Sequence, residues 1–195
     1  GGTGLDGSIA EVYKFSRVLN SAEQIIIANY LAAKYAITLS VNDIYNEDNV
    51  GNGNYDHDVA GIGRIDASNL HNDSRGTGIV RILNPSGLGN NEFLFWGHDN
   101  GDLQATETSD VPIGIDARFD RVWRVSERNT TNSSNVNVGN IDMRWDLTGL
   151  GSVIASDLRL LIDTDRDGLF ADETPISGAI DLGNGIYQFS SVSSI

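Results

Sequence analysis

The sequence predicts a mostly β fold, an antiparallel β-sandwich with one amphipathic helix near the N-terminus. Short apolar segments separated by polar turns follow one another after residue 60, as in sandwiches. The clearest alternation places Ile141, Met143, Trp145 and Leu147 on one face, with charged residues between them. One buried face and one wet face is the pattern of antiparallel strands. A length of 195 residues suits a single large β domain.

The first twenty residues are predicted to form a leading strand. A Gly-rich turn precedes residues 8–15 (SIAEVYKF), where apolar side chains alternate only in part. We expect this strand to pair along one sheet edge. A domain boundary near residue 20 then separates this leading strand, residues 1–20, from a helix plus sandwich, residues 21–195.

A single helix is expected over residues 22–35. Asn20 and Ser21 mark its start, and Ser21 with Gln24 has the spacing of a capping box. Apolar residues recur at helical spacing on one face, which predicts a buried packing stripe. These residues are Ile25, Ala28, Leu31, Ala32 and Tyr35.

The polar stretch of residues 40–57 is predicted to be a surface loop. The rest of the chain is predicted to be a series of strands, with apolar segments between polar turns. The expected strands are residues 59–65, 78–83, 92–96, 118–127, 136–147, 157–163 and 186–192.

The composition narrows the classes of partner. The net charge is −14, so the chain repels phosphate backbones and anionic membrane surfaces. We therefore expect no nucleic-acid partner. The apolar runs are too short for membrane insertion. There is no cysteine, which excludes disulfides, thiolate metal sites and a cysteine nucleophile. Divalent cations are the natural partners of such a surface.

Residues 163–174 (DTDRDGLFADET) predict a calcium site. Asp163, Asp165 and Asp167 stand at positions 1, 3 and 5, and a glycine follows at position 6, as at the start of a calcium loop. Calcium takes six to eight oxygen ligands, and alternate carboxylates on a tight turn converge on one point. The carbonyl of Leu169 is expected to supply the next oxygen.

The end of this turn departs from the EF-hand pattern. Position 12 is Thr174, where an EF-hand has a bidentate Glu, and the flanks are predicted strands. We expect Asp172 or Glu173 to close the site, and the bound Ca²⁺ to be structural. The alternative is a solvated acidic turn, but three aligned carboxylates repel one another, which favours an ion.

Histidine and tryptophan give weaker signals. His57, His71 and His98 lie among Asp and Asn residues, and hydrogen bonding to neighbours is favoured over a metal or catalytic role. The three tryptophans stand inside apolar strands, where core packing is expected. Trp96 is the best exception, because it leads directly into a polar turn. Trp96, His98, Asp99 and Asn100 form the candidate ligand-binding cluster.

No motif for catalysis is present. The sequence has no GxSxG elbow, and Gly61-Ile62-Gly63 lacks the continuation of a dinucleotide fingerprint. Acidic residues are so frequent that no particular pair indicates glycoside hydrolysis. We therefore predict that the chain is not an enzyme.

Several segments resemble the end of laminin-G/concanavalin-like domains and the uncharacterised β-sandwich that follows them in large secreted or surface proteins of marine bacteria and Bacteroidota. The closing strand and exit helix are similar over residues 6–12 (DGSIAEV), 17–23 (RVLNSAE) and 30–39 (YLAAKYAITL). The sandwich is similar over residues 58–64 (DVAGIGR), 95–101 (FWGHDNG), 121–125 (RVWRV) and 157–163 (DLRLLID). The resemblance implies a secreted or cell-surface, multidomain parent, and it supplies no catalytic residue.

The expected function is therefore that of a non-catalytic, adhesin-type extracellular module of a large bacterial surface or secreted protein. Calcium stabilises it, and its partners are neighbouring domains of the same polypeptide, with surface glycans or proteins as further partners. A carbohydrate-binding accessory module is the alternative that the Trp96 cluster keeps open. A piece of a hydrolase is the third hypothesis.

Overall fold

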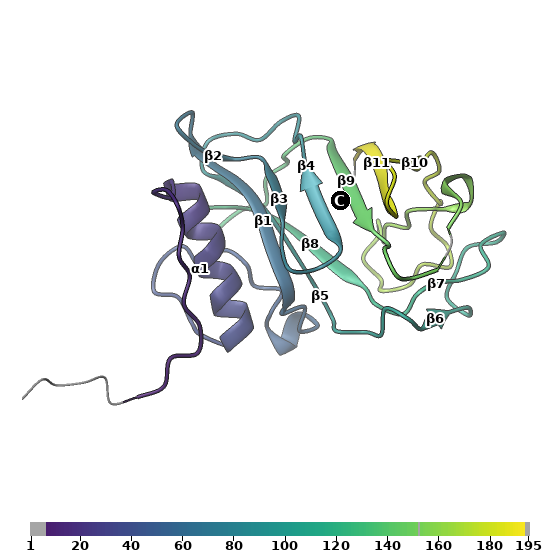
Figure 1. The fold of residues 1–195 in the computed structure, drawn as a ribbon, viewed down its shortest axis with the longest axis horizontal. Coiled ribbons are helices and arrows are strands. Elements are labelled where there is room, and N and C mark those ends of the chain that lie inside the picture. Colours follow the sequence, from purple (N-terminus) through teal and green to yellow (C-terminus); the bar gives the residue numbers. More distant parts are fainter. Residues whose placement is uncertain (1–6, 152, 194–195) are drawn as a thin grey trace, which may run out of the picture.

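The computed structural model describes residues 7–151 and 153–193. A helix, a four-stranded sheet and a five-stranded sheet form three successive layers (Figure 1). The helix is α1 (Ser21–Tyr35). The strands are β1 (His57–Asp66), β2 (Asn69–His71), β3 (Asp73–Arg75), β4 (Val80–Leu83), β5 (Glu92–His98), β6 (Thr106–Glu107), β7 (Arg118–Phe119), β8 (Trp123–Asn129), β9 (Ile141–Asp146), β10 (Ile180–Asp181) and β11 (Ile186–Val192).

The two larger sheets are antiparallel, as the sequence predicts. The first has the strand order β2-β1-β5-β8 and the second β10-β11-β9-β4-β3, while β6 and β7 pair separately. One apolar core lies between the sheets, and α1 covers the other face of the first sheet over β1 and β2. The predicted mostly β sandwich with one N-terminal helix is confirmed.

Strand β5 is buried on both faces, because it lies between the two cores. Leu94 and Trp96 belong to the core between the sheets, whereas Phe93 and Phe95 belong to the core under the helix. All four side chains are at most 2% exposed. Alternate residues of a strand point to opposite faces, so this apolar run holds the helix and the second sheet to the same strand.

Two glycines of β1 make room for the β5 phenylalanines. Gly61 is the cross-strand partner of Phe95, and Gly63 is the partner of Phe93. A Cβ on Gly61 would lie 2.7 Å from a ring carbon of Phe95, and one on Gly63 would overlap the ring of Phe93. The Gly61-Ile62-Gly63 motif therefore serves packing.

The helix begins one residue earlier than predicted, and its cap is different. Asn20 is the N-cap and accepts the amide of Glu23, while Glu23 accepts the amide of Asn20, so the predicted Ser21–Gln24 box is wrong. Glu23 also accepts two hydrogen bonds from Arg17, at 2.5 and 2.7 Å. Ser21 is instead the first residue of the helix, and its backbone amide donates to the side chain of Asn69.

Strong acid should remove the stability that the charged Glu23 side chain gives to this cap. The Arg17 guanidinium lowers the pKa of Glu23 to about 2 from 4.5. A carboxyl whose pKa is lower in the folded state stabilises the fold above its unfolded pKa, and this stabilisation disappears as the pH falls to the folded pKa. We expect Glu23→Gln to be destabilising at pH 7 and to approach the unsubstituted chain between about pH 4.5 and pH 2. Urea unfolding across this range measures it, and a constant difference would contradict it.

The predicted strand over residues 8–15 is wrong. These residues form no strand; the segment runs alongside α1 (Figure 1). Glu11 accepts hydrogen bonds from Lys34 and Tyr35, and the ring of Tyr13 meets that of Tyr30 edge-on. The segment packs on the helix surface and pairs with no strand. Residues 1–6 of the predicted closing strand lie outside the described residues.

The loop after the helix is not confined to the surface. Ile44 and Tyr45 are fully buried, which corrects the predicted surface loop of residues 40–57. Asn29, itself 1% exposed, accepts both of their amides and donates to the carbonyl of Asn42. One helix side chain thus supplies the hydrogen bonds that this buried backbone needs.

Other strands differ in extent. The predicted strand 157–163 is only a bridge between Leu160 and Ile176, because the segment leaves the sheet for a short 3₁₀ turn and an acidic loop. The predicted strand 118–127 is divided into β7 and β8, and 136–147 contributes β9 alone. The very short strands β2, β3, β6 and β10 carry too few apolar residues for a pattern to show.

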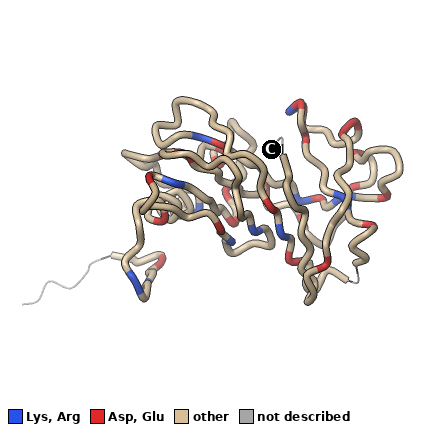
Figure 2. The backbone as a smooth tube through the Cα atoms, turned by 90° about the horizontal axis from the view of Figure 1, so that it is seen from above, with Lys and Arg blue, Asp and Glu red and all other residues tan. Residues whose placement is uncertain are grey.

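Charged residues of both signs are spread along the chain and do not gather on one face (Figure 2). Within the described ranges, none of the helices has the length and apolarity that crossing a bilayer requires.

Candidate metal centre

The acidic turn, residues 163–174, lies in a closed loop and is held by hydrogen bonds from its own backbone amides. The backbone bridge between Leu160 and Ile176 closes it, with both hydrogen bonds at 2.9 Å. Asp163 accepts the amides of Arg166 at 2.6 Å and Gly168 at 3.0 Å. Gly168 has φ +86°, a conformation that glycine adopts without a steric penalty, so the chain can reverse here.

The carboxylates converge, as the spacing predicts. Asp163, Asp165 and Glu173 each offer an oxygen within 4.8 Å of the others, and Asp165, Asp167 and Asp172 form a second such group. Asp165 belongs to both groups. These five acidic residues, brought together by the fold, could hold a metal ion. In the part of the chain that the structure describes, no other group of three His, Cys, Asp or Glu residues comes this close.

The sixth predicted ligand is not part of either group. Leu169 instead contacts the turn through its backbone amide, which donates to the carboxylate of Asp167 at 2.8 Å. Its carbonyl therefore stays a prediction. Glu173, near the end of the turn, is buried, and its carboxylate accepts the amide of Thr164 at 2.5 Å. This hydrogen bond to the start of the turn fixes the position of the carboxylate.

Electrostatics in the turn favour a cation. The amide of Asp167 lowers the pKa of Asp165, but partial desolvation within the turn and the carboxylates of Asp167, Asp172 and Asp163 outweigh it, so the pKa is raised. Proximity of like charges disfavours the ionised form. A divalent ion between the carboxylates would reverse that repulsion.

A distant residue that the sequence analysis missed orders the turn from outside. One carboxylate oxygen of Asp110 accepts the amides of Phe170 and Ala171, at 2.7 and 3.0 Å. The other accepts a hydrogen bond from Arg118 at 2.9 Å, and that guanidinium lies over the ring of Phe170. Sixty residues separate Asp110 from Phe170, so no local pattern could have indicated this contact.

Two of the three histidines meet in space, and they form no metal group with other described residues. His57 and His98 are cross-strand partners with stacked rings. His98 is buried; its Nε2 lies 3.0 Å from Asp58, and its Nδ1 accepts the amide of Asn100. The hydrogen bond from His98 lowers the pKa of Asp58. These contacts agree with a histidine that is hydrogen-bonded to its neighbours.

The predicted ligand cluster around Trp96 has no exposed aromatic face. Trp96 is 2% exposed and packs between the sheets, and His98 is equally buried. Asp99 and Asn100 are exposed, but the Asp99 carboxylate accepts the amides of Gly101 and Val122 within the turn. This burial argues against sugar binding at the cluster.

Comparison with known proteins identifies the family. No curated protein and no solved structure matches the chain. A family model described as a domain of unknown function (DUF8202) matches residues 79–192, which include β4 to β11 and the whole acidic turn. The match extends over more than half of the sequence, and the chain belongs to this DUF8202 family.

Proposed function

We propose that the chain is a non-catalytic extracellular module of a large bacterial surface or secreted protein, stabilised by Ca²⁺ in the turn of residues 163–173. The convergence of Asp163, Asp165 and Glu173 carries this proposal. Hard oxygen ligands on a turn suit calcium. The acidic composition and the absence of cysteine fit a surface protein that uses ions where others use disulfides.

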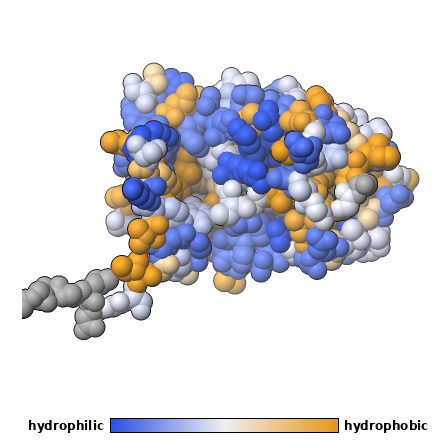
Figure 3. Space-filling model, viewed as in Figure 1, coloured by the Kyte–Doolittle hydropathy of each residue, from blue (hydrophilic) through white to orange (hydrophobic). Residues whose placement is uncertain are grey.

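The N-terminal segment supports a neighbouring domain as partner. Ile9, Val12 and Val18 are 64, 78 and 90% exposed on a stretch that pairs with no sheet. Figure 3 shows apolar atoms on this segment beside the grey N-terminal residues. Exposed apolar groups gathered on one segment are typical of contact surfaces. We infer that a preceding domain of the same polypeptide covers them, as the adhesin-type arrangement requires.

Calcium should raise the melting temperature of the chain, and a chelator should lower it. Binding at a concentration of about 100 times the dissociation constant adds roughly 2.7 kcal/mol, which corresponds to about 5–10 °C for a domain of this size. Asp165→Asn keeps the hydrogen-bond acceptor but removes the charge. We expect it to abolish the response to calcium without lowering the melting temperature in chelator, because it also relieves the repulsion.

The matched control is Asp181→Asn. Asp181 accepts the amide of Gly183 in an exposed turn at 2.7 Å, so it has the same local role away from the acidic groups. This variant should keep the full response. Equal melting temperatures of the unsubstituted chain in calcium and in chelator would refute the calcium site.

A further inference from the structure

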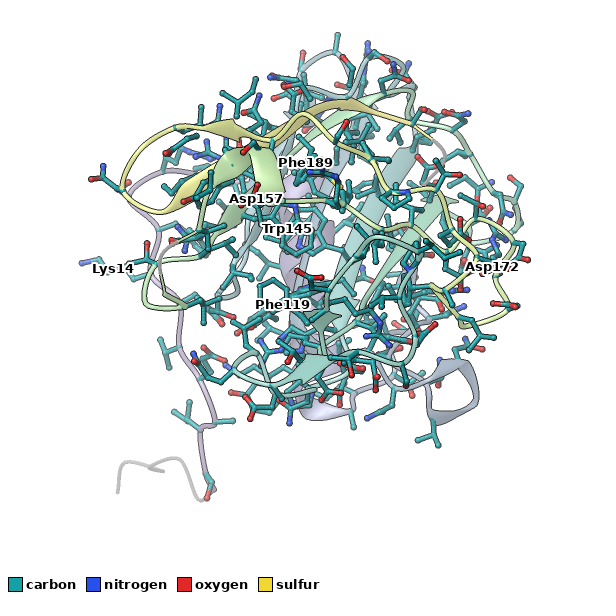
Figure 4. All side chains as sticks on the ribbon, turned by 90° about the vertical axis from the view of Figure 1, so that its right-hand side faces the viewer. Lys14, Phe119, Trp145, Asp157, Asp172 and Phe189 are labelled. Carbon is teal, nitrogen blue, oxygen red and sulfur yellow. The ribbon has the colours of Figure 1, made fainter. Side chains whose placement is uncertain are left out.

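The sandwich is open at one end. A pocket of about 910 Å³ lies there, between the inner faces of β8 and β9 and under the segment of residues 157–170. Figure 4 looks at this end of the molecule and shows Trp145 between Phe119 and Phe189. The floor reaches the core, since Met143 and Phe189 are only 5 and 4% exposed.

Two indoles form the aromatic wall of the pocket. Trp123 of β8 and Trp145 of β9 meet edge-on with ring centroids 4.9 Å apart, and both are only partly buried although they pack against the core. The Nε1 of Trp145 is buried and has no hydrogen-bond partner. An unpartnered buried donor is costly. The two rings are therefore incompletely covered by apolar groups, and the indole nitrogen of Trp145 lacks an acceptor.

The charges around the pocket are balanced in a strongly acidic chain. Six arginines and six carboxylates line it, whereas the whole chain has a net charge of −14. Several of the carboxylates already accept hydrogen bonds from backbone amides. Glu127 accepts the amide of Val138, and Asp163 and Asp167 accept amides within the acidic turn. By contrast, four of the arginines form no ion pair with any described residue. These are Arg121, Arg128, Arg159 and Arg166, of which Arg121 and Arg159 donate to backbone carbonyls.

We propose that this pocket binds an amphiphilic anion, a compact apolar or aromatic body with one carboxylate or sulfonate head. The body would cover Trp123 and Trp145, and the head would meet the unpaired guanidinium groups, which bind such oxyanions well. This inference goes beyond the proposed function and does not depend on calcium.

Anilinonaphthalene sulfonate and phenylnaphthylamine test the proposal as a matched pair of fluorescent probes, because only the first has an anionic head. We expect the sulfonate to bind one per chain and at least about tenfold more tightly than the neutral probe. The double variant Arg159→Gln/Arg166→Gln should lose about tenfold in affinity for the sulfonate and leave binding of the neutral probe unchanged. All titrations are made in excess chelator, so failure of the calcium site does not affect them.

Arg81→Gln is the control. Arg81 does not line this pocket and pairs with Asp73 on the neighbouring strand, at 2.6 Å. The Arg81→Gln variant should bind both probes as the unsubstituted chain does. Near-ultraviolet circular dichroism checks that each variant is folded. Equal affinity for the two probes, an unchanged affinity in the double variant, or no saturable binding of the sulfonate would overturn the proposal.

Discussion

Replacing Asn29 with leucine is expected to lower the free energy of unfolding by about 3 kcal/mol, because it leaves buried amides without an acceptor. The Oδ1 of Asn29 accepts the amides of Ile44 and Tyr45, both at 2.9 Å, and its Nδ2 donates to the carbonyls of Ile25 and Asn42. Leucine has a similar volume, so the loss comes from hydrogen bonds and not from a cavity. Urea unfolding measures the change.

A matched control separates this effect from the loss of any asparagine that hydrogen-bonds to the loop. Asn52 also donates to a loop carbonyl, that of Asn46, but it is exposed, and Asn52→Leu should change the stability by no more than about 0.5 kcal/mol. Faster amide exchange at Ile44 and Tyr45 in the Asn29 variant would locate the damage. If the two variants lost similar stability, the buried asparagine would not be the anchor of this loop.

Replacing Gly63 with alanine is expected to cost about 2 kcal/mol, the range found for overpacked sites. The added methyl group would overlap the ring of Phe93, which is fully buried between the first sheet and α1. Because Gly63 and Phe93 are cross-strand partners, neither backbone can move aside without breaking the ladder. Thermal or urea unfolding gives the loss.

A double-mutant cycle identifies the cause. Phe93→Leu removes ring atoms, so Gly63→Ala should cost less in that background than in the unsubstituted chain. Gly51→Ala is the control, since nothing lies within 4 Å of a Cβ there and its φ is not positive. Additive effects of Gly63→Ala and Phe93→Leu would mean that steric overlap with the ring is not responsible.

The sequence predicts what is local in this molecule. The alternation around Met143 follows from one wet face and one buried face, and β9 has that arrangement. The acidic turn could be predicted because its five carboxylates lie within eleven residues of one another. In both cases the residues that create the pattern also form the structure.

Contacts between distant residues had no such signal. Asp110 reaches the turn from sixty residues away, and Asn29 appears in the sequence as a polar residue on an otherwise ordinary helix. Residues 8–15 have strand-like composition, but they pair with no strand and lie against the helix. Strand pairing and buried hydrogen bonds depend on how the layers pack against one another. The sequence of a single strand or helix does not indicate that packing.

The central position of β1 shows that the folded unit is larger than the region that the family model matches. The family match begins at residue 79, whereas β1 lies between β2 and β5 in the first sheet and pairs with β5 through most of its length. A fragment cut at residue 79 would leave β5 with a bare backbone edge and expose the rings of Phe93 and Phe95. Such edges promote aggregation. A domain transplanted into another protein must therefore carry α1 and β1 with it.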